Sequence, residues 1–340
     1  MTQLAGFLDK YDTLIFDLDG VITCEQHYWT AAALTVWEVL HSADYFGTQK
    51  LDAAQMSKTS AEIRKQVFCA DRTITLLKKK GVNNNWDLGY VVFACAKILG
   101  TEDFEAIYSY AQGFSDDILE VYDLIGKKLS EVMPGVDTKR NGELWTRMQM
   151  CFQEWFLGEE NFKKQFGRNP ILKGKGGLCY SEEPLIDGEK LKTIFDLLKK
   201  ENKRLCIGTG RPKLEMEIPM ESFGIMPQLD QKGIVHYDHV QTTEARTGVN
   251  VTKPHPFVFL KGLYGVDYPE EKLLEEAKAP KRHENVLVVG DAGADILAAQ
   301  AAGMDFCAVL TGVSGQEARG YFEETGADYI LDSLENFLVE

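Results

Sequence analysis

The sequence has 340 residues and a hydrophobic fraction of 44%, enough for one large or two ordinary domains with a sizeable core. Its formal net charge of -15 argues against a general binder of nucleic acids or anionic membranes, because phosphate backbones need a positive surface. The seven cysteines are odd in number and form no CxxC pair, which favours a reducing compartment. The sequence shows no signal peptide and no run of membrane-spanning length, so we expect a cytoplasmic protein.

The first informative segment is an apolar run that ends in two aspartates. Residues 13–21 are TLIFDLDGV, with Asp17 and Asp19 two positions apart. The run predicts a buried parallel strand, and ligands of such sheets bind just outside the carboxyl ends of the strands. Strand alternation would point both carboxylates the same way. Two like charges this close persist only with a cation between them or a proton on one of them.

The second zone, residues 24–180, is predicted to be almost wholly helical. Apolar spacing indicates helices at 28–40, 61–67, 86–99, 104–114, 118–129, 144–157 and 161–166. Helices joined by short loops predict a compact bundle. The zone ends in the Gly-rich segment 173–177, which suits a hinge and equally a surface turn.

The third zone, residues 181–340, alternates predicted helices and strands. Helices are expected at 191–200 and 296–302, and strands at 204–208, 235–240, 286–290, 306–310 and 329–331. This alternation predicts a parallel sheet with helices on both faces. The isolated first strand needs that sheet in order to be buried. We therefore predict an α/β fold with a doubly wound parallel sheet formed by residues 1–23 and 181–340, and a large all-α domain, residues 24–180, inserted after the first strand.

Three further segments should meet the two aspartates at the carboxyl edge of this sheet. They are Gly208–Pro212 (GTGRP), Thr252–Pro254 (TKP) and Gly290–Asp295 (GDAGAD). A hydroxyl with exposed backbone N–H groups can bind phosphate oxygens, and a lysine supplies a compact positive charge. Carboxylates could complete an oxygen-only site that suits Mg²⁺. Each segment alone is a weak signal, but their order and placement at strand ends predict a magnesium-assisted phosphoryl site.

With these four segments in order, the chain resembles the haloacid-dehalogenase (HAD) superfamily. It is most similar in pattern to the phosphoglycolate phosphatase-like branch, whose helical cap is inserted between the first and second motifs. The resemblance implies that Asp17 is the nucleophile that forms an aspartyl-phosphate. It also implies that Asp19 protonates the leaving oxygen and then deprotonates the attacking water. Dehalogenase members lack an acid at the position of Asp19, so carbon–halogen chemistry is disfavoured.

The resemblance also assigns the binding residues. Thr209 and the backbone of Gly210 would hold the phosphoryl group together with Lys253. Gly20 and Arg211 are further candidates for contact with substrate or phosphate, and for Arg211 a structural ion pair is the alternative.

The implied cofactor is Mg²⁺. The resemblance implies that it is bound by Asp17, the backbone carbonyl of Asp19 and Asp291, and that Asp295 supports or shares that ligation. A carboxylate nucleophile needs such a cation, because it would otherwise repel an anionic phosphate.

The expected function is therefore Mg-dependent hydrolysis of a small phosphorylated metabolite through an aspartyl-phosphate. A phosphotransferase or sugar-phosphate mutase with the same intermediate is the alternative, and a receiver-like phospho-Asp signalling protein is a more distant one. No nucleic-acid or membrane partner is expected. The insertion is longer than usual caps of this branch, which indicates either a larger binding cavity or a contact between copies in a homo-oligomer.

Overall fold

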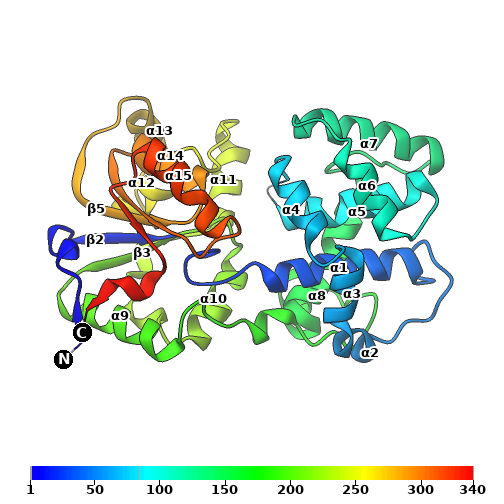
Figure 1. Ribbon diagram of the computed structural model, residues 1–340, viewed down its shortest axis with the longest axis horizontal. Coiled ribbons are helices and arrows are strands. Elements are labelled where there is room, and N and C mark those ends of the chain that lie inside the picture. The colour runs from blue at the N-terminus through cyan, green and yellow to red at the C-terminus, as the bar shows by residue number, and fades with distance from the viewer. Residues whose placement is uncertain (1, 83, 340) are drawn as a thin grey trace. The chain divides into compact units, whose positions relative to one another are not determined.

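The chain folds into two compact units. The computed structural model describes residues 2–82 and 84–339. One unit combines residues 1–25 with residues 182–340, and the other consists of residues 26–181. We call them the α/β unit and the helical unit, and Figure 1 shows the elements of each.

The α/β unit is built on a six-stranded sheet in which every neighbouring pair of strands is parallel. In spatial order its strands are β4 (Ile234–Val235), β3 (Arg204–Gly208), β2 (Thr13–Phe16), β5 (His283–Gly290), β6 (Met304–Val309) and β7 (Tyr329–Leu331). The predicted α/β class and parallel sheet are confirmed. The first strand lies at the centre, where Phe16 is in register with Ile207 of β3 and Val289 of β5.

Side chains of the central strand alternate between two apolar cores. Leu14 and Phe16 enter the core that is covered by α9 (Gly188–Lys200) and α10 (Lys213–Ser222). Ile15 enters the core on the opposite face. A strand with both faces covered has no solvent side, which is why its sequence is a continuous apolar run.

The opposite face is covered by the remaining helices of this unit (Figure 1). They are α11 (Tyr237–Thr247), α12 (Phe257–Tyr264), α13 (Glu270–Lys278), α14 (Gly293–Ala301) and α15 (Arg319–Thr325). The prediction of a strand at 235–240 is wrong beyond Val235, because α11 begins at Tyr237. The polar segment that follows contributes only a short buried face to that helix, Val240 and Thr243, one turn apart.

Short elements complete the α/β unit. Strands β1 (Gln3–Leu4) and β8 (Leu338–Val339) pair antiparallel, so the first and last strands of the chain lie side by side. The short 3₁₀ helices of this unit are η1 (Gly6–Lys10), η3 (Met226–Gln228), η4 (Gln231–Gly233), η5 (Gly315–Ala318) and η6 (Leu334–Phe337).

The helical unit is a bundle, as the sequence predicted. Its elements are α1 (Gln26–His41), α2 (Ala53–Lys58), α3 (Ser60–Val67), α4 (Arg72–Lys79), α5 (Asn85–Leu99), α6 (Phe104–Gln112), α7 (Ile118–Val132), α8 (Glu143–Phe166) and η2 (Leu178–Ser181). Helix α1 packs against α3, α5 and α8. A Cβ added at Gly89 of α5 would lie 3.6 Å from the carbonyl oxygen of Ala32 in α1, so the two helices approach closely at this point.

Helix α8 is interrupted at Gly158. This residue has φ 76° and ψ 170°, a conformation that only glycine adopts without large strain. The predicted segments 144–157 and 161–166 lie on either side of this break. Its position therefore follows from a glycine between two apolar helical patterns.

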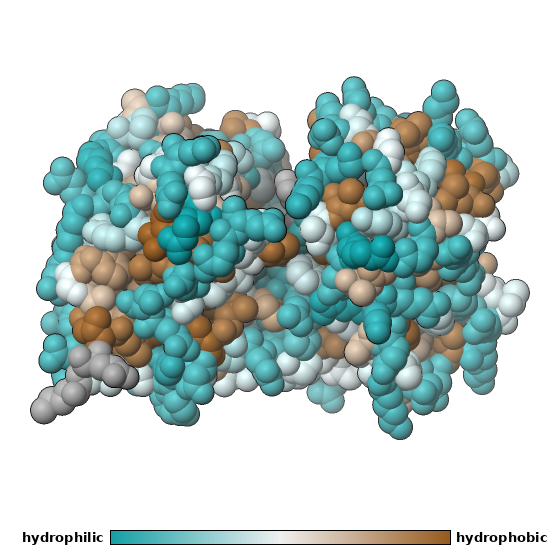
Figure 2. Space-filling view, in the orientation of Figure 1, coloured by the Kyte–Doolittle hydropathy of each residue, from teal (hydrophilic) through white to brown (hydrophobic). Residues whose placement is uncertain are grey.

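The visible face is mostly hydrophilic, with smaller hydrophobic patches between charged side chains (Figure 2). Among the described residues, no helix combines the length and the apolar character needed to cross a bilayer.

Candidate active site

The end of β2 places Asp17 beside a buried lysine. The ammonium of Lys253 lies 3.0 Å from Oδ1 of Asp17 and 2.8 Å from Oδ1 of Asp295. All three side chains are largely buried. Burial alone would lower the pKa of Lys253, but the two carboxylates outweigh it and raise that pKa, so the lysine is held in its charged form.

Three carboxylates converge at this edge of the sheet. Asp17, Asp291 and Asp295 each offer an oxygen atom, and these atoms lie within 4.8 Å of one another. Burial, joined by repulsion from Asp295 and Asp19, raises the pKa of Asp17 to about 7, although Lys253 opposes the shift. Burial, joined by repulsion from Asp295 and Asp17, also raises the pKa of Asp291 well above its usual value. One ammonium therefore does not neutralise the cluster, and its all-oxygen donor set fits Mg²⁺.

Two glycines make room for the carboxylate of Asp291. A Cβ added at Gly20 would come within 2.2 Å of Oδ2 of Asp291, and a Cβ at Gly312 within 1.8 Å. Gly20 also has a φ of 77°, which favours glycine. The hydroxyl of Thr311 donates to the carbonyl of Gly20 at 2.6 Å, which links the two segments around Asp291. The space that holds this carboxylate thus depends on the absence of side chains.

The end of β3 supplies a hydroxyl and an accessible backbone. Thr209 is buried, and its N–H donates to the carbonyl of Val235 at 3.0 Å. Its hydroxyl oxygen accepts from the N–H of Arg211 at 3.1 Å. A Cβ added at Gly210 would meet no other atom within 4 Å, so this backbone borders open space. A phosphate oxygen could approach it without a steric barrier.

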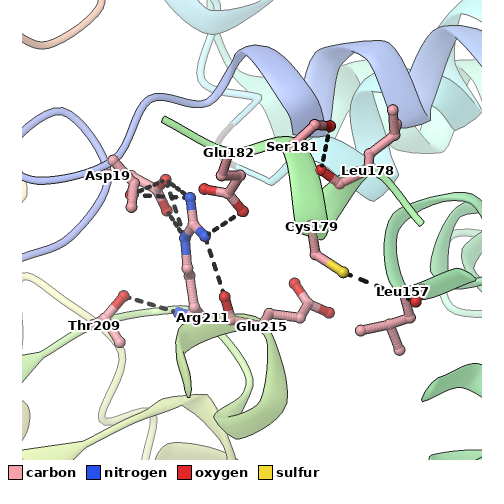
Figure 3. Close-up of polar contacts among 10 residues, drawn as sticks. Asp19, Leu157, Leu178, Cys179, Ser181, Glu182, Thr209, Arg211 and Glu215 are labelled. Carbon is pink, nitrogen blue, oxygen red and sulfur yellow. Dashed lines mark hydrogen bonds and ion pairs between the residues drawn. The ribbon is translucent and has the colours of Figure 1, made fainter. Parts of the chain in front are cut away.

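The side chain of Asp19 pairs with Arg211, apart from the cluster of three carboxylates. Nη2 of Arg211 lies 2.6 Å from Oδ1 of Asp19, and Nε lies 3.0 Å from Oδ2. Nη1 of the same guanidinium lies 2.9 Å from Oε1 of Glu182. Figure 3 shows the guanidinium between these two carboxylates, with Thr209 and Glu215 nearby. Burial raises the pKa of Glu182, an effect that Arg211 opposes.

The structure thus brings the predicted residues of all four segments to one edge of the sheet. Asp17, Asp291, Asp295 and Lys253 lie together, whereas the carboxylate of Asp19 faces Arg211. Sequence reasoning missed Glu182. It belongs to no motif that carries chemistry, and no sequence signal links it to a residue almost thirty positions later.

The helical unit contains a second group of potential ligands, Glu38, Cys151 and Glu154. The ammonium of Lys175 already lies among them, 2.7 Å from Oε2 of Glu38 and 2.6 Å from Oε2 of Glu154. These residues are buried, and Nε1 of Trp155 also donates to Glu38. A cation is therefore built into this group, and we interpret it as a structural ion-pair network.

The helical unit also has a cavity of about 670 Å³. It is lined mainly by small and polar residues of α1, α2 and α3 and by Gly176 and Gly177. Arg64 borders the cavity, but Asp71 binds its guanidinium through two hydrogen bonds of 3.0 and 2.6 Å. The cavity therefore presents hydroxyl groups and a neutralised arginine, together with Lys65, His27 and Trp155.

Comparisons with known proteins agree with this site. A family model described as HAD-hydrolase-like matches residues 251–337. No curated protein matches the chain. A solved structural-genomics protein, whose name states no organism and no activity, is 27% identical with a TM-score of 0.79, and the match covers 95% of this chain and 96% of that chain.

Two further solved structures carry provisional activities in their names. The first is a phosphatase from Clostridium difficile, 18% identical with a TM-score of 0.44, covering 96% of this chain and 95% of that one. The second is a beta-phosphoglucomutase from Thermotoga maritima, 16% identical with a TM-score of 0.44, covering 96% of both chains.

The family match and the site fall on the same part of the chain. The segment 251–337 contains Lys253, Asp291 and Asp295, so the family match falls on residues of the site itself. This segment is similar to HAD-like hydrolases, in agreement with the resemblance inferred from the sequence.

Proposed function

We propose that this protein is a Mg²⁺-dependent phosphatase that hydrolyses a small phosphorylated metabolite through an aspartyl-phosphate on Asp17. The observation that carries the proposal is the contact between Lys253 and Asp17, 3.0 Å apart, within a cluster of three carboxylates. A buried carboxylate that is paired with an ammonium is a nucleophile whose charge is partly balanced before an anionic phosphoryl group arrives.

In the first step a carboxylate oxygen of Asp17 attacks phosphorus, and the bond from phosphorus to the leaving oxygen breaks. The carboxyl of Asp19 gives its proton to that oxygen, so an alcohol departs and Asp17 becomes an acyl phosphate. Lys253, the Thr209 hydroxyl and the Gly210 N–H would bind the phosphoryl oxygens. Their contribution is to stabilise charge and to hold the reacting atoms in line.

In the second step the carboxylate of Asp19 takes a proton from a water molecule. The resulting hydroxide attacks phosphorus, the bond to Asp17 breaks, and inorganic phosphate and the Asp17 carboxylate are regenerated. One residue can serve both steps because the proton it donates first is replaced by the proton it accepts later.

Asp17 and Asp291, with the backbone carbonyl of Asp19, would hold Mg²⁺. Both oxygens of Asp295 already accept hydrogen bonds, from Lys253 at 2.8 Å and from the N–H of Ala292 at 3.2 Å. Asp295 is therefore better suited to orient the site than to bind the ion directly. The ion would supply positive charge against the attacked phosphoryl group, the charge that the carboxylate cluster lacks.

The test is phosphate release from a panel of phosphorylated metabolites and an aryl phosphate, with Mg²⁺ or with EDTA. We expect the wild type to release phosphate only with Mg²⁺. The rate of release should fall at least about a hundredfold in Asp17→Asn, which is the usual effect of removing one electrostatic catalytic group. Asp9→Asn, which removes an exposed carboxylate of the same unit, should retain full activity. The best substrate would name the metabolite.

Two results would contradict the proposal. An active Asp17→Asn would show that Asp17 is not the nucleophile. Isomerised product with little free phosphate would replace hydrolysis by the mutase alternative. The free energy of unfolding of Asp17→Asn, measured without metal, shows whether the variant is folded. We expect it to be no less stable than the wild type, because the substitution removes a charge from a repelling cluster.

A further inference from the structure

We propose that Glu182 is a positioning residue that binds Arg211 when Asp19 moves to the substrate. The inference deepens the proposed function and rests on it, because it concerns how the proton donor is released. Asp19 cannot protonate a leaving group while both of its oxygens are held by the guanidinium of Arg211, at 2.6 and 3.0 Å. The ion pair observed here must therefore open during each turnover.

Opening this pair would normally be unfavourable, because Arg211 is only 2% exposed. A buried charge that loses its partner is strongly destabilised, and this cost would add directly to the barrier of the reaction. Two other acceptors of this guanidinium, the carbonyl of Glu215 and the hydroxyl of Thr23, are neutral. They satisfy N–H groups but do not balance the positive charge.

Glu182 provides the second carboxylate. Its Oε1 lies 2.9 Å from Nη1 of Arg211, on the side of the guanidinium that Asp19 does not occupy (Figure 3). Its Oε2 is buried and has no hydrogen-bond partner among the described residues. Because Glu182 binds Nη1, its contact does not depend on the Nε and Nη2 atoms that Asp19 would release. The arginine would therefore keep one carboxylate partner when Asp19 leaves.

A neutral amide at position 182 would remove one of the two carboxylates that bind this guanidinium. With Glu182→Gln, Asp19 balances a larger share of the charge of Arg211 and is held more tightly. Proton donation should then fail most for leaving groups that depend on it. An alkoxide needs a proton to depart, whereas an acidic phenol departs readily as its anion.

The experiment is a leaving-group series measured on the full chain with Mg²⁺. We would determine kcat/KM for aryl phosphates of increasing phenol pKa and for the best alkyl phosphate. Asp19→Asn gives the pattern expected when the proton donor is lost. We expect Glu182→Gln to reduce kcat/KM about tenfold for the alkyl phosphate and less than about twofold for the aryl phosphate with the most acidic phenol. A tenfold reduction is a fraction of the effect of losing a general acid completely. Glu183→Gln is the matched control, because it makes the same change at an exposed neighbour.

The ratio of rates between substrates separates this role from a structural one. A partly unfolded sample lowers every rate by the same factor and leaves the slope of log kcat/KM against phenol pKa unchanged. An unchanged slope in Glu182→Gln would overturn the inference. Glu182→Asp, which keeps the charge, should restore the slope toward that of the wild type. An active Asp17→Asn would overturn the proposed function itself, whereas an inactive Asp17→Asn with an unchanged slope in Glu182→Gln would overturn only this inference.

Discussion

At the scale of single residues, the site depends on where side chains are missing. Gly312 has no role in binding or chemistry, yet its Cα faces the carboxylate of Asp291 so closely that a methyl group would lie 1.8 Å from Oδ2. Asp291 would have to move if that space were filled. Because a metal ligand must be held within a fraction of an ångström, the effect should fall on metal binding before it falls on folding.

We therefore expect Gly312→Ala to raise the Mg²⁺ concentration for half-maximal phosphate release by about tenfold, the usual size of a displaced supporting contact. Gly320→Ala is the control, because a Cβ at that helical position meets no atom within 4 Å. A magnesium titration of both variants checks the prediction. An unchanged midpoint in Gly312→Ala would mean that Asp291 is not a ligand or that it moves without consequence.

A second residue-scale prediction concerns acid stability. Burial, followed by the neighbouring His239, lowers the pKa of His236 to about 3, and the residue is 8% exposed. In the unfolded chain this pKa is near 6.5, so below that pH the unfolded state binds a proton that the folded state does not. Stability should then fall with falling pH, by about 1 kcal/mol between about pH 7.5 and pH 5.5.

Urea unfolding at the two pH values measures this difference. Asparagine has no group that titrates in this range, and it suits the N-cap position directly before α11. We therefore expect His236→Asn to lose about 1 kcal/mol less than the wild type. Equal losses in both proteins would show that His236 is protonated without penalty in the folded state.

At the scale of elements, the sequence predicted strands that are buried on both faces and helices with a clear apolar face. Strand β2 and helix α5 are continuous apolar segments, and both were predicted within a few residues. Helix α11 was missed, because His236–Val240 resembles a strand locally and the segment that follows is polar. The acids at the sheet edge were predictable from motifs. The contact of Glu182 with Arg211 was not predictable, because it exists only after the chain has folded.

The break in α8 gives an element-scale prediction. A Cβ at Gly158 would lie 2.7 Å from the backbone nitrogen of Gly177, and the φ of 76° is itself unfavourable for alanine. We expect Gly158→Ala to destabilise the helical unit by about 2 kcal/mol or more. Gly126→Ala in α7 is the opposite case, because its Cβ would sit at an ordinary 3.7 Å from the nearest atom and glycine weakens a helix interior. That variant should gain about 0.5–1 kcal/mol.

Thermal or urea unfolding of the two variants tests both directions. Equal effects of Gly158→Ala and Gly126→Ala would show that the segment around Gly177 moves aside readily and that the break in α8 is not fixed by these contacts.

At the scale of the whole molecule, the two units have separate cores. The two apolar cores of the α/β unit draw none of their described members from residues 26–181. The helical unit begins with α1 and ends with η2, and these two elements pack against each other. A segment whose ends meet and whose core is its own has the properties of an independently folding domain.

We therefore expect a fragment of residues 26–181 to fold alone, with a helical circular dichroism spectrum and a single cooperative unfolding transition. It should release no phosphate, because every predicted catalytic residue lies outside it. A broad, non-cooperative transition would show that the helical unit needs the α/β unit in order to fold.

The central position of β2 also bears on how the protein is made. This strand precedes the whole helical unit in the chain, yet its neighbours β3 and β5 begin at Arg204 and His283. The helical unit is complete in the nascent chain before either neighbour has been synthesised. It can therefore fold before β2 has a strand to pair with. The short strand β8, which pairs with β1, follows all of these strands in the chain. The acids at the ends of β2 and β5 can therefore come together only after β5 has been synthesised.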